Sequence, residues 1–256
     1  DEFVSKSWSL EAALIKVENL MDWFDRGDAN GPFRRLIWQP LADAEAREHD
    51  LHKQVMGQVE RVFSKLDKAR LSEAISVSGS AQTYLRSDIM AIALNMGNAS
   101  NLDKLLRGEA WSQETLNAYV ANLNADEANA VQEIWDIVDQ FWPQISAMEK
   151  RLSGVAPPRV EAQAVTISGV ELRGGYYPMK YDPRRSHDVS DRQTALQADA
   201  MFRPGNSRVE TRHGFAKERS QSYTRPLLLD LDGLASHLSD VIHDVTHREA
   251  VLPAYK

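Results

Sequence analysis

Residues 208–251 read RVETRHGFAKERSQSYTRPLLLDLDGLASHLSDVIHDVTHREAV, and this stretch decides how the second half of the chain folds. A basic loop leads into three consecutive leucines, Leu227 to Leu229, and then into a histidine-rich segment whose apolar residues recur every three or four positions. That spacing is typical of an amphipathic helix. We therefore expect a terminal helix that is entered near Asp230 or Asp232 and runs from Leu234 to Val251.

The first half of the chain repeats the helical pattern several times. Apolar residues recur at helical spacing in 7–26, 33–67, 82–95, 101–108 and 125–153, and Ser112 is placed to cap a further helix. We expect Pro40 to break or kink the second helix, because proline removes a backbone donor and clashes with the preceding turn. Pro143 should kink the helix at 125–153 in the same way. Gly97 is placed to end the helix at 82–95 as its C-cap.

Composition changes after residue 154. Pro157 and Pro158 exclude a helix, and the segment VTISGVELRGG at 165–175 has short β-branched runs divided by Gly169, which predicts one small hairpin. From Arg184 to Arg225 the sequence is polar and shows no clear period. A connection of that length is usually functional or held down by a partner.

The sequence thus predicts a mainly α fold, a multi-helix assembly with a small β-hairpin and a long ordered loop in the C-terminal half. We expect a helical body at 1–154. The remaining residues, 155–256, should hold the hairpin, the basic loop and the C-terminal helix, and should pack on the body as one globular unit.

The overall composition excludes several classes of protein. The chain has 256 residues and no cysteine, so disulfides and thiolate metal sites are excluded. No apolar run approaches the roughly 20 residues of a membrane span, and the N-terminus lacks the apolar core of a signal peptide. A net charge of -7 argues against a general nucleic-acid coat. Since the chain begins without Met, we expect it to be a piece of a longer protein.

The basic loop is the first candidate site. Lys and Arg outnumber Asp and Glu between 171 and 225, and within the loop they alternate with Phe215 and Tyr223. Such a pattern suits phosphates and stacked bases, although a loop clamped to acidic helices by salt bridges would show it too. The candidate residues for nucleic-acid or anion binding are Arg208, Arg212, His213, Lys217, Arg219 and Arg225.

The second candidate site lies on the last helix. His243 and His247 are four residues apart and so share a face, and the string H-D-x-x-H resembles the H-E-x-x-H of zinc peptidases. Asp244 replaces the glutamate that serves as general base there, and a third ligand from His187 or His213 would require a tertiary contact. Alternatively, the histidines and the acidic residues form the polar rim of a helix whose Leu238, Val241, Ile242 and Val245 face the core. We nominate no catalytic residue, since no G-x-S-x-G or phosphate-cradling loop is present.

Four strings taken together resemble a known family. ALNMGNASNLDKLL, IWDIVDQFWPQISAMEKRLSGVAPPRVEA, GGYYPMKYDPRRS and RHGFAKERSQSYTRPLLLDLDGLASHLSDVIHDVTHREAV occur in this order between 93 and 251. The succession is similar to a module of the very large polyvalent proteins of tailed bacteriophages. In that module the pairs His243-Asp244 and Arg248-Glu249 belong to the pattern, whereas the position of His247 is less settled.

The resemblance implies a non-enzymatic structural or binding module of a virion-associated or ejected polyprotein. Its partners would be the other modules of that polyprotein and, through the basic loop, nucleic acid. The protein would then occur in the virion, or in the host cytoplasm after injection, and this hypothesis requires no cofactor. The alternative is a metal-dependent hydrolase centred on His243 and His247.

Overall fold

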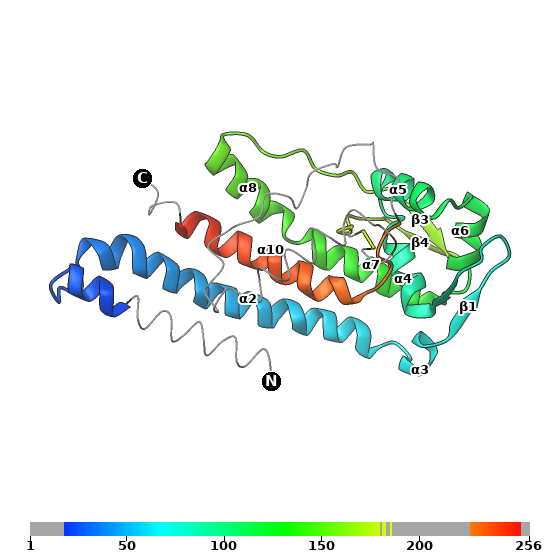
Figure 1. Ribbon diagram of the computed structural model, residues 1–256, viewed down its shortest axis with the longest axis horizontal. Coiled ribbons are helices and arrows are strands. Elements are labelled where there is room, and N and C mark those ends of the chain that lie inside the picture. The colour runs from blue at the N-terminus through cyan, green and yellow to red at the C-terminus, as the bar shows by residue number, and fades with distance from the viewer. Residues whose placement is uncertain (1–17, 180, 183–184, 186–225, 252–256) are drawn as a thin grey trace. The chain divides into compact units, whose positions relative to one another are not determined.

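The computed structural model describes residues 18–179, 181–182, 185 and 226–251 (Figure 1). The described residues are mainly helical, as the sequence predicts, and they also form two small two-stranded sheets. Its described residues fall into two compact units, the first containing 18–53 and 239–251 and the second 54–179, 181–182, 185 and 226–238. The predicted loop from Arg184 to Arg225 lies, apart from Arg185, outside the described residues.

The elements follow one another as a helical stretch at 18–24, the π-helix η1 (Arg34–Trp38), α2 (Gln39–Ser64), α3 (Lys68–Leu71), β1 (Ala74–Ser76), β2 (Thr83–Leu85), α4 (Arg86–Leu94), α5 (Ala99–Glu109), α6 (Gln113–Val120), α7 (Ala125–Asp139), α8 (Trp142–Ser153), β3 (Val165–Ile167), β4 (Val170–Leu172) and α10 (Asp232–Val251). The terminal helix therefore begins at one of the two predicted aspartates. In this described part of the chain, no helix combines the length and apolarity needed to cross a bilayer.

The second unit is built around α4. Every residue from Ile89 to Leu94 is fully buried, and a helix that is apolar on all sides is stable only where other elements surround it. Helices α3, α6 and α7 and strand β2 pack on it. The large side chains that fill the core of this unit, all inaccessible or nearly so, are Leu105, Leu116, Tyr119, Ile134, Trp135 and Phe141.

A close approach of backbones follows the end of α4. Asn95, not Gly97, is the C-cap of this helix, so the predicted role of Gly97 is wrong. Instead Gly97 is needed for space, because a Cβ there would lie 2.5 Å from the ring of Trp135 and 2.6 Å from the carbonyl oxygen of Gly175. The carbonyl of Gly97 accepts hydrogen bonds from the backbone of Gln163 and Gly175, which ties the segment around β3 and β4 to the helices.

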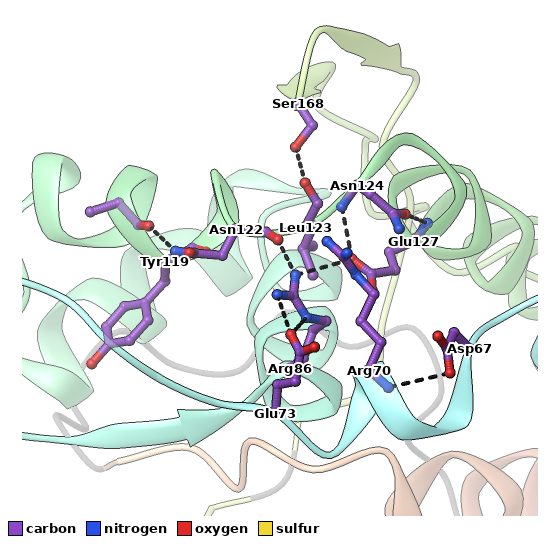
Figure 2. Close-up of polar contacts among 11 residues, drawn as sticks. Asp67, Arg70, Glu73, Arg86, Tyr119, Asn122, Leu123, Asn124, Glu127 and Ser168 are labelled. Carbon is purple, nitrogen blue, oxygen red and sulfur yellow. Dashed lines mark hydrogen bonds and ion pairs between the residues drawn. The ribbon is translucent and has the colours of Figure 1, made fainter.

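A buried ion-pair network holds α4 to α7 (Figure 2). Arg86, whose side chain is 7% exposed, bonds Glu73 at 2.7 Å and lies 3.5 Å from Glu127, and it donates to the carbonyl of Asn122. The carboxylate of Glu127 also accepts from Arg70 at 3.2 Å. Because each buried charge has an opposite charge or a carbonyl beside it, the network avoids the cost of an unpaired ion in the core.

Of the two hairpins, the sequence predicted one. Strands β3 and β4 pair antiparallel through a two-residue turn, Ser168-Gly169, in which both residues have positive φ. That geometry matches the right-handed twist of the strands and favours glycine. The β1–β2 hairpin was missed, and residues 83–85, predicted as the start of a helix, form its second strand.

The first unit contains a π-helix, whose turns are wider than those of a regular α-helix. Five residues, Arg34–Trp38, form a π-helix immediately before α2, whose second residue is Pro40. The wider turn relieves the clash that Pro40 would make with the carbonyl four residues earlier. The helical path therefore continues through Pro40, so the predicted break is not found, and the hydrogen-bond pattern changes just before it.

Candidate metal centre

Three potential metal ligands meet between α2 and α10 within the first unit. Glu48 projects from the N-terminal half of α2, while His243 and His247 project from the C-terminal half of α10. The two histidines are four residues apart, and residues at that spacing lie one above the other on a helix face. Further along the two helices, His52 contacts Ser239, so residue numbers rise along α2 as they fall along α10. The two segments are therefore antiparallel.

The carboxylate of Glu48 lies between the two imidazoles. Its Oε1 is 3.3 Å from Nδ1 of His243, and its Oε2 is 3.4 Å from Nδ1 of His247. The rings stack at 4.4 Å with an interplanar angle of 19°. One ligand atom from each residue can be chosen so that all three lie within 4.8 Å of one another.

The donor set fits a divalent transition-metal ion. Zinc binds imidazole nitrogen and carboxylate oxygen at about 2.0–2.2 Å, which puts neighbouring ligands of a tetrahedral site roughly 3.3 Å apart. The separations of Glu48 from the two histidines match that value. Two imidazoles and a carboxylate also suit iron and other first-row metals, whereas calcium and magnesium prefer oxygen ligands alone.

Two of the three side chains have shifted pKa values, each in the direction of the form that binds a metal. Burial lowers the pKa of His247 and the nearby charge of His243 lowers it further, so the neutral imidazole is favoured. Burial opposes ionisation of Glu48, but the hydrogen bond from His243 and the charges of the neighbouring histidines lower its pKa below the ordinary value. Metal ligands must be neutral imidazole and ionised carboxylate.

The three side chains are partly accessible. Glu48, His243 and His247 expose 28%, 18% and 13% of their side-chain area. Thr246, the residue before His247, places its hydroxyl 3.0 Å from Nδ1 of that ring. An ion could therefore enter from solvent, and the hydroxyl of Thr246 would have to give up its contact with Nδ1 if that nitrogen bound the metal.

The interpretation of α10 as a helix with a polar rim holds only in part. Leu238, Val241 and Ile242 are buried as predicted. Asp244 is also buried, at 3% exposure, so it is not a rim residue, and Val245 is only half-buried.

The structure brings together one predicted pair of site residues and adds a residue that the sequence did not reveal. His243 and His247 share a face, and Glu48 joins them from a position 195 residues away in sequence. The proposed third ligands, His187 and His213, lie outside the described residues. So do all six residues of the candidate nucleic-acid site, Arg208, Arg212, His213, Lys217, Arg219 and Arg225, and that interface stays a prediction.

Only one sequence signal could have identified Glu48. It stands four residues before His52 in the string EHDLH, which puts two ligand-type side chains on one face of α2. Among the many acidic residues of that helix, the signal is weak. Comparisons of the chain with protein-family models, with curated proteins and with solved structures found no match.

Proposed function

We propose that this chain is a metal-binding helical module, with one divalent transition-metal ion held by Glu48, His243 and His247. The observation that carries the proposal is the carboxylate of Glu48 lying 3.3 and 3.4 Å from two stacked imidazoles on the facing helix. Such an ion would join α2 to α10 within the first unit, and its binding free energy would add to the stability of the folded chain.

The test is zinc binding by protein prepared without a polyhistidine tag and stripped of metal. Calorimetric titration of the parent with Zn²⁺ should give one tight site per chain. Glu48→Gln and His243→Ala should each weaken binding at least about tenfold, because each removes a ligand. His49→Ala is the matched control, since this exposed histidine lies next to Glu48 on α2 and is not part of the cluster.

Two results would overturn the proposal. One is a parent protein that takes up no zinc, cobalt or iron. The other is a Glu48→Gln variant that binds each metal as the parent does. In either case the contact between Glu48 and the histidines is a structural ion pair between two helices.

We place this module, on the resemblance described above, within a phage polyprotein, where it would act as a non-enzymatic scaffold or binding part. The proposed contact with nucleic acid rests on the basic and aromatic composition of 208–225. Changing Arg212, Lys217 and Arg219 together to alanine should weaken DNA or RNA binding and lessen its dependence on salt. Unchanged binding at matched low salt would remove the nucleic-acid hypothesis and leave the metal site untouched.

A metal-dependent hydrolase is the second candidate, and the partial exposure of the three ligands favours it. A catalytic zinc has three protein ligands and keeps a position for water, which the metal makes acidic enough to attack at neutral pH. Zinc-loaded protein should then hydrolyse peptide or phosphodiester substrates, and His243→Ala should not. The coordination number of the bound metal distinguishes the two candidates.

A further inference from the structure

We infer that His52 is a fourth protein ligand of this metal centre, which closes the coordination sphere and makes the ion a structural link between α2 and α10. The inference rests on the proposed function, because it needs a metal at Glu48, His243 and His247.

The position of His52 on α2 carries the first part of the argument. His52 follows Glu48 by four residues, so both side chains leave the same face of the helix, with Cβ atoms about 5–6 Å apart. On the facing helix His243 and His247 have the same spacing. Two antiparallel helices thus present two ligand pairs to each other, one pair from each helix.

The contact with Ser239 carries the second part. Nε2 of His52 lies 3.1 Å from the hydroxyl of Ser239, and Ser239 precedes His243 by one helical turn. The imidazole of His52 therefore lies between the two helices, one turn from His243 along α10 and outside the cluster of Glu48, His243 and His247. A rotation to another staggered rotamer moves an imidazole by several ångströms without any movement of the backbone.

The chemistry of the groups favours this rotation when a metal is bound. The hydrogen bond between His52 and Ser239 has only a modest net value, since water can replace either partner. Imidazole is one of the preferred ligands of zinc, copper and nickel, whereas a serine hydroxyl is a poor one.

A fourth protein ligand decides between the two candidate functions, a structural metal site and a metal-dependent hydrolase. With Glu48, His52, His243 and His247 all bound, a tetrahedral ion has no position left for water. Such a centre stabilises the fold, as structural zinc sites do, and does not generate a nucleophile.

The experiment counts the imidazoles on the metal. Protein loaded with one equivalent of Cu²⁺ is measured by pulsed electron paramagnetic resonance, which detects the remote nitrogen of each coordinated ring. The parent should show the signals of His52, His243 and His247, and His52→Gln should show one ring fewer. Loaded with Co²⁺, the parent should give the strong visible absorption of a four-coordinate ion, and His52→Gln a weaker band from a site completed by water.

Two variants keep the test independent of folding. His52→Gln retains a hydrogen-bonding group towards Ser239 but is a poor ligand, and it should bind Zn²⁺ at least about tenfold more weakly than the parent. Ser239→Ala removes the competing contact and leaves the imidazole in place, so it should bind Zn²⁺ as tightly as the parent or more tightly.

The inference fails if the parent and His52→Gln give the same ring count and the same zinc affinity, while His243→Ala loses both. It also fails if Ser239→Ala weakens binding as much as His52→Gln does, because His52 would then act through its contact with Ser239. Failure of the proposed function has a different signature, since the parent itself would then bind no metal or Glu48→Gln would bind as the parent does.

Discussion

Arg86 is the residue on which the polar interior of the second unit most depends. Its guanidinium serves Glu73, Glu127 and the carbonyl of Asn122 from a site that is almost inaccessible to water. Without Arg86, Glu127 would keep only Arg70 as a charged partner and the carbonyl of Asn122 would lose its donor, so the cost should lie near the lower end of the roughly 3–5 kcal/mol of a broken buried ion pair. We predict that Arg86→Ala lowers the free energy of unfolding in urea by about 3 kcal/mol or more.

Lys65→Ala provides the comparison. Lys65 bonds Glu133 at 2.7 Å, as short as the contact of Arg86 with Glu73, but the two side chains are 58% and 42% exposed. Because water screens an exposed pair, this change should cost no more than about 1 kcal/mol. Equal losses in the two variants would show that burial of the Arg86 network adds nothing.

Two glycines give opposite predictions for the same substitution. At Gly175 a Cβ would lie 2.5 Å from Cβ of Trp135, so Gly175→Ala should destabilise the chain by about 1–3 kcal/mol through overpacking. At Gly57, inside α2, no atom lies within 4 Å of the added carbon, and Gly57→Ala should stabilise the chain by about 1 kcal/mol through helix propensity. Thermal unfolding of the two variants checks both signs, and a gain at Gly175 would contradict the close approach.

For single residues, the sequence indicated which positions are important more reliably than it indicated their roles. Gly97 stands where a helix ends, so a capping role was the natural prediction. The fold uses it for a contact with Trp135 and Gly175 that no local pattern encodes. Glu48 escaped notice for the same physical reason, since its partners are set by the packing of α2 against α10.

Helix α7 shows how strongly a local signal can fix an element. Asn124 accepts a hydrogen bond from the backbone of Glu127, and the carboxylate of Glu127 accepts one from the backbone of Asn124. This reciprocal capping satisfies two otherwise unpaired donors at the helix start. We predict that Asn124→Ala costs about 1 kcal/mol in chemical unfolding.

The control for this cap lies one turn further along the same helix. Asn129 is exposed in the interior of α7, where alanine is the better helix former. Asn129→Ala should therefore change stability by less than about 0.5 kcal/mol or raise it slightly. A loss at Asn129 as large as that at Asn124 would assign the effect to the amide in general and not to the cap.

Elements with strong local signals were predicted, and those set by tertiary contact were not. The cap at Ser112, the end of α8 at Ser153 and the hairpin turn at Gly169 all follow from side-chain chemistry or from positive φ. The β1–β2 hairpin has three-residue strands that alone cannot be distinguished from the start of a helix. The π-helix runs directly into α2, so the helix continues through Pro40. Sequence rules for proline predict a break at that position.

For the molecule as a whole, one buried and one half-buried tyrosine predict a limit to stability at alkaline pH. Burial and the charge of Asp230 raise the pKa of Tyr177, and burial and Glu109 raise the pKa of Tyr84. The unfolded chain loses these phenol protons near pH 10, while the folded chain keeps them. The stabilisation is thus complete below pH 10 and is lost as pH rises above it.

For Tyr177, which is 4% exposed, the loss should approach about 1.4 kcal/mol per pH unit. Urea unfolding of the parent and of Tyr177→Phe between pH 8 and about 11.5 measures it as the difference between the two slopes. Identical slopes above pH 10 would show that Tyr177 ionises equally in the folded and unfolded chains.

The mainly helical class could be predicted from periodicity alone, because apolar residues at helical spacing dominate the first 154 positions. The division of the chain could not, since the first unit joins residues near both ends of the sequence. Packing of 155–256 on a body at 1–154 as one globular unit stays a prediction, and so does the phage origin. His243 and His247 could be paired from their spacing on one helix. Glu48 could not be assigned to the site, because that required knowing which helix faces the two histidines.

Trp23 and Trp135 give each compact unit an optical signal of its own. The indole of Trp23 is 73% exposed, whereas that of Trp135 is inaccessible and donates to the carbonyl of Leu94. An indole in water fluoresces at longer wavelength and collides freely with acrylamide, and one in an apolar interior does neither. In a variant whose other four tryptophans are changed to phenylalanine, emission at the red edge of the spectrum would therefore report on the first unit and emission at the blue edge on the second, so the two could be followed in one cuvette without any label.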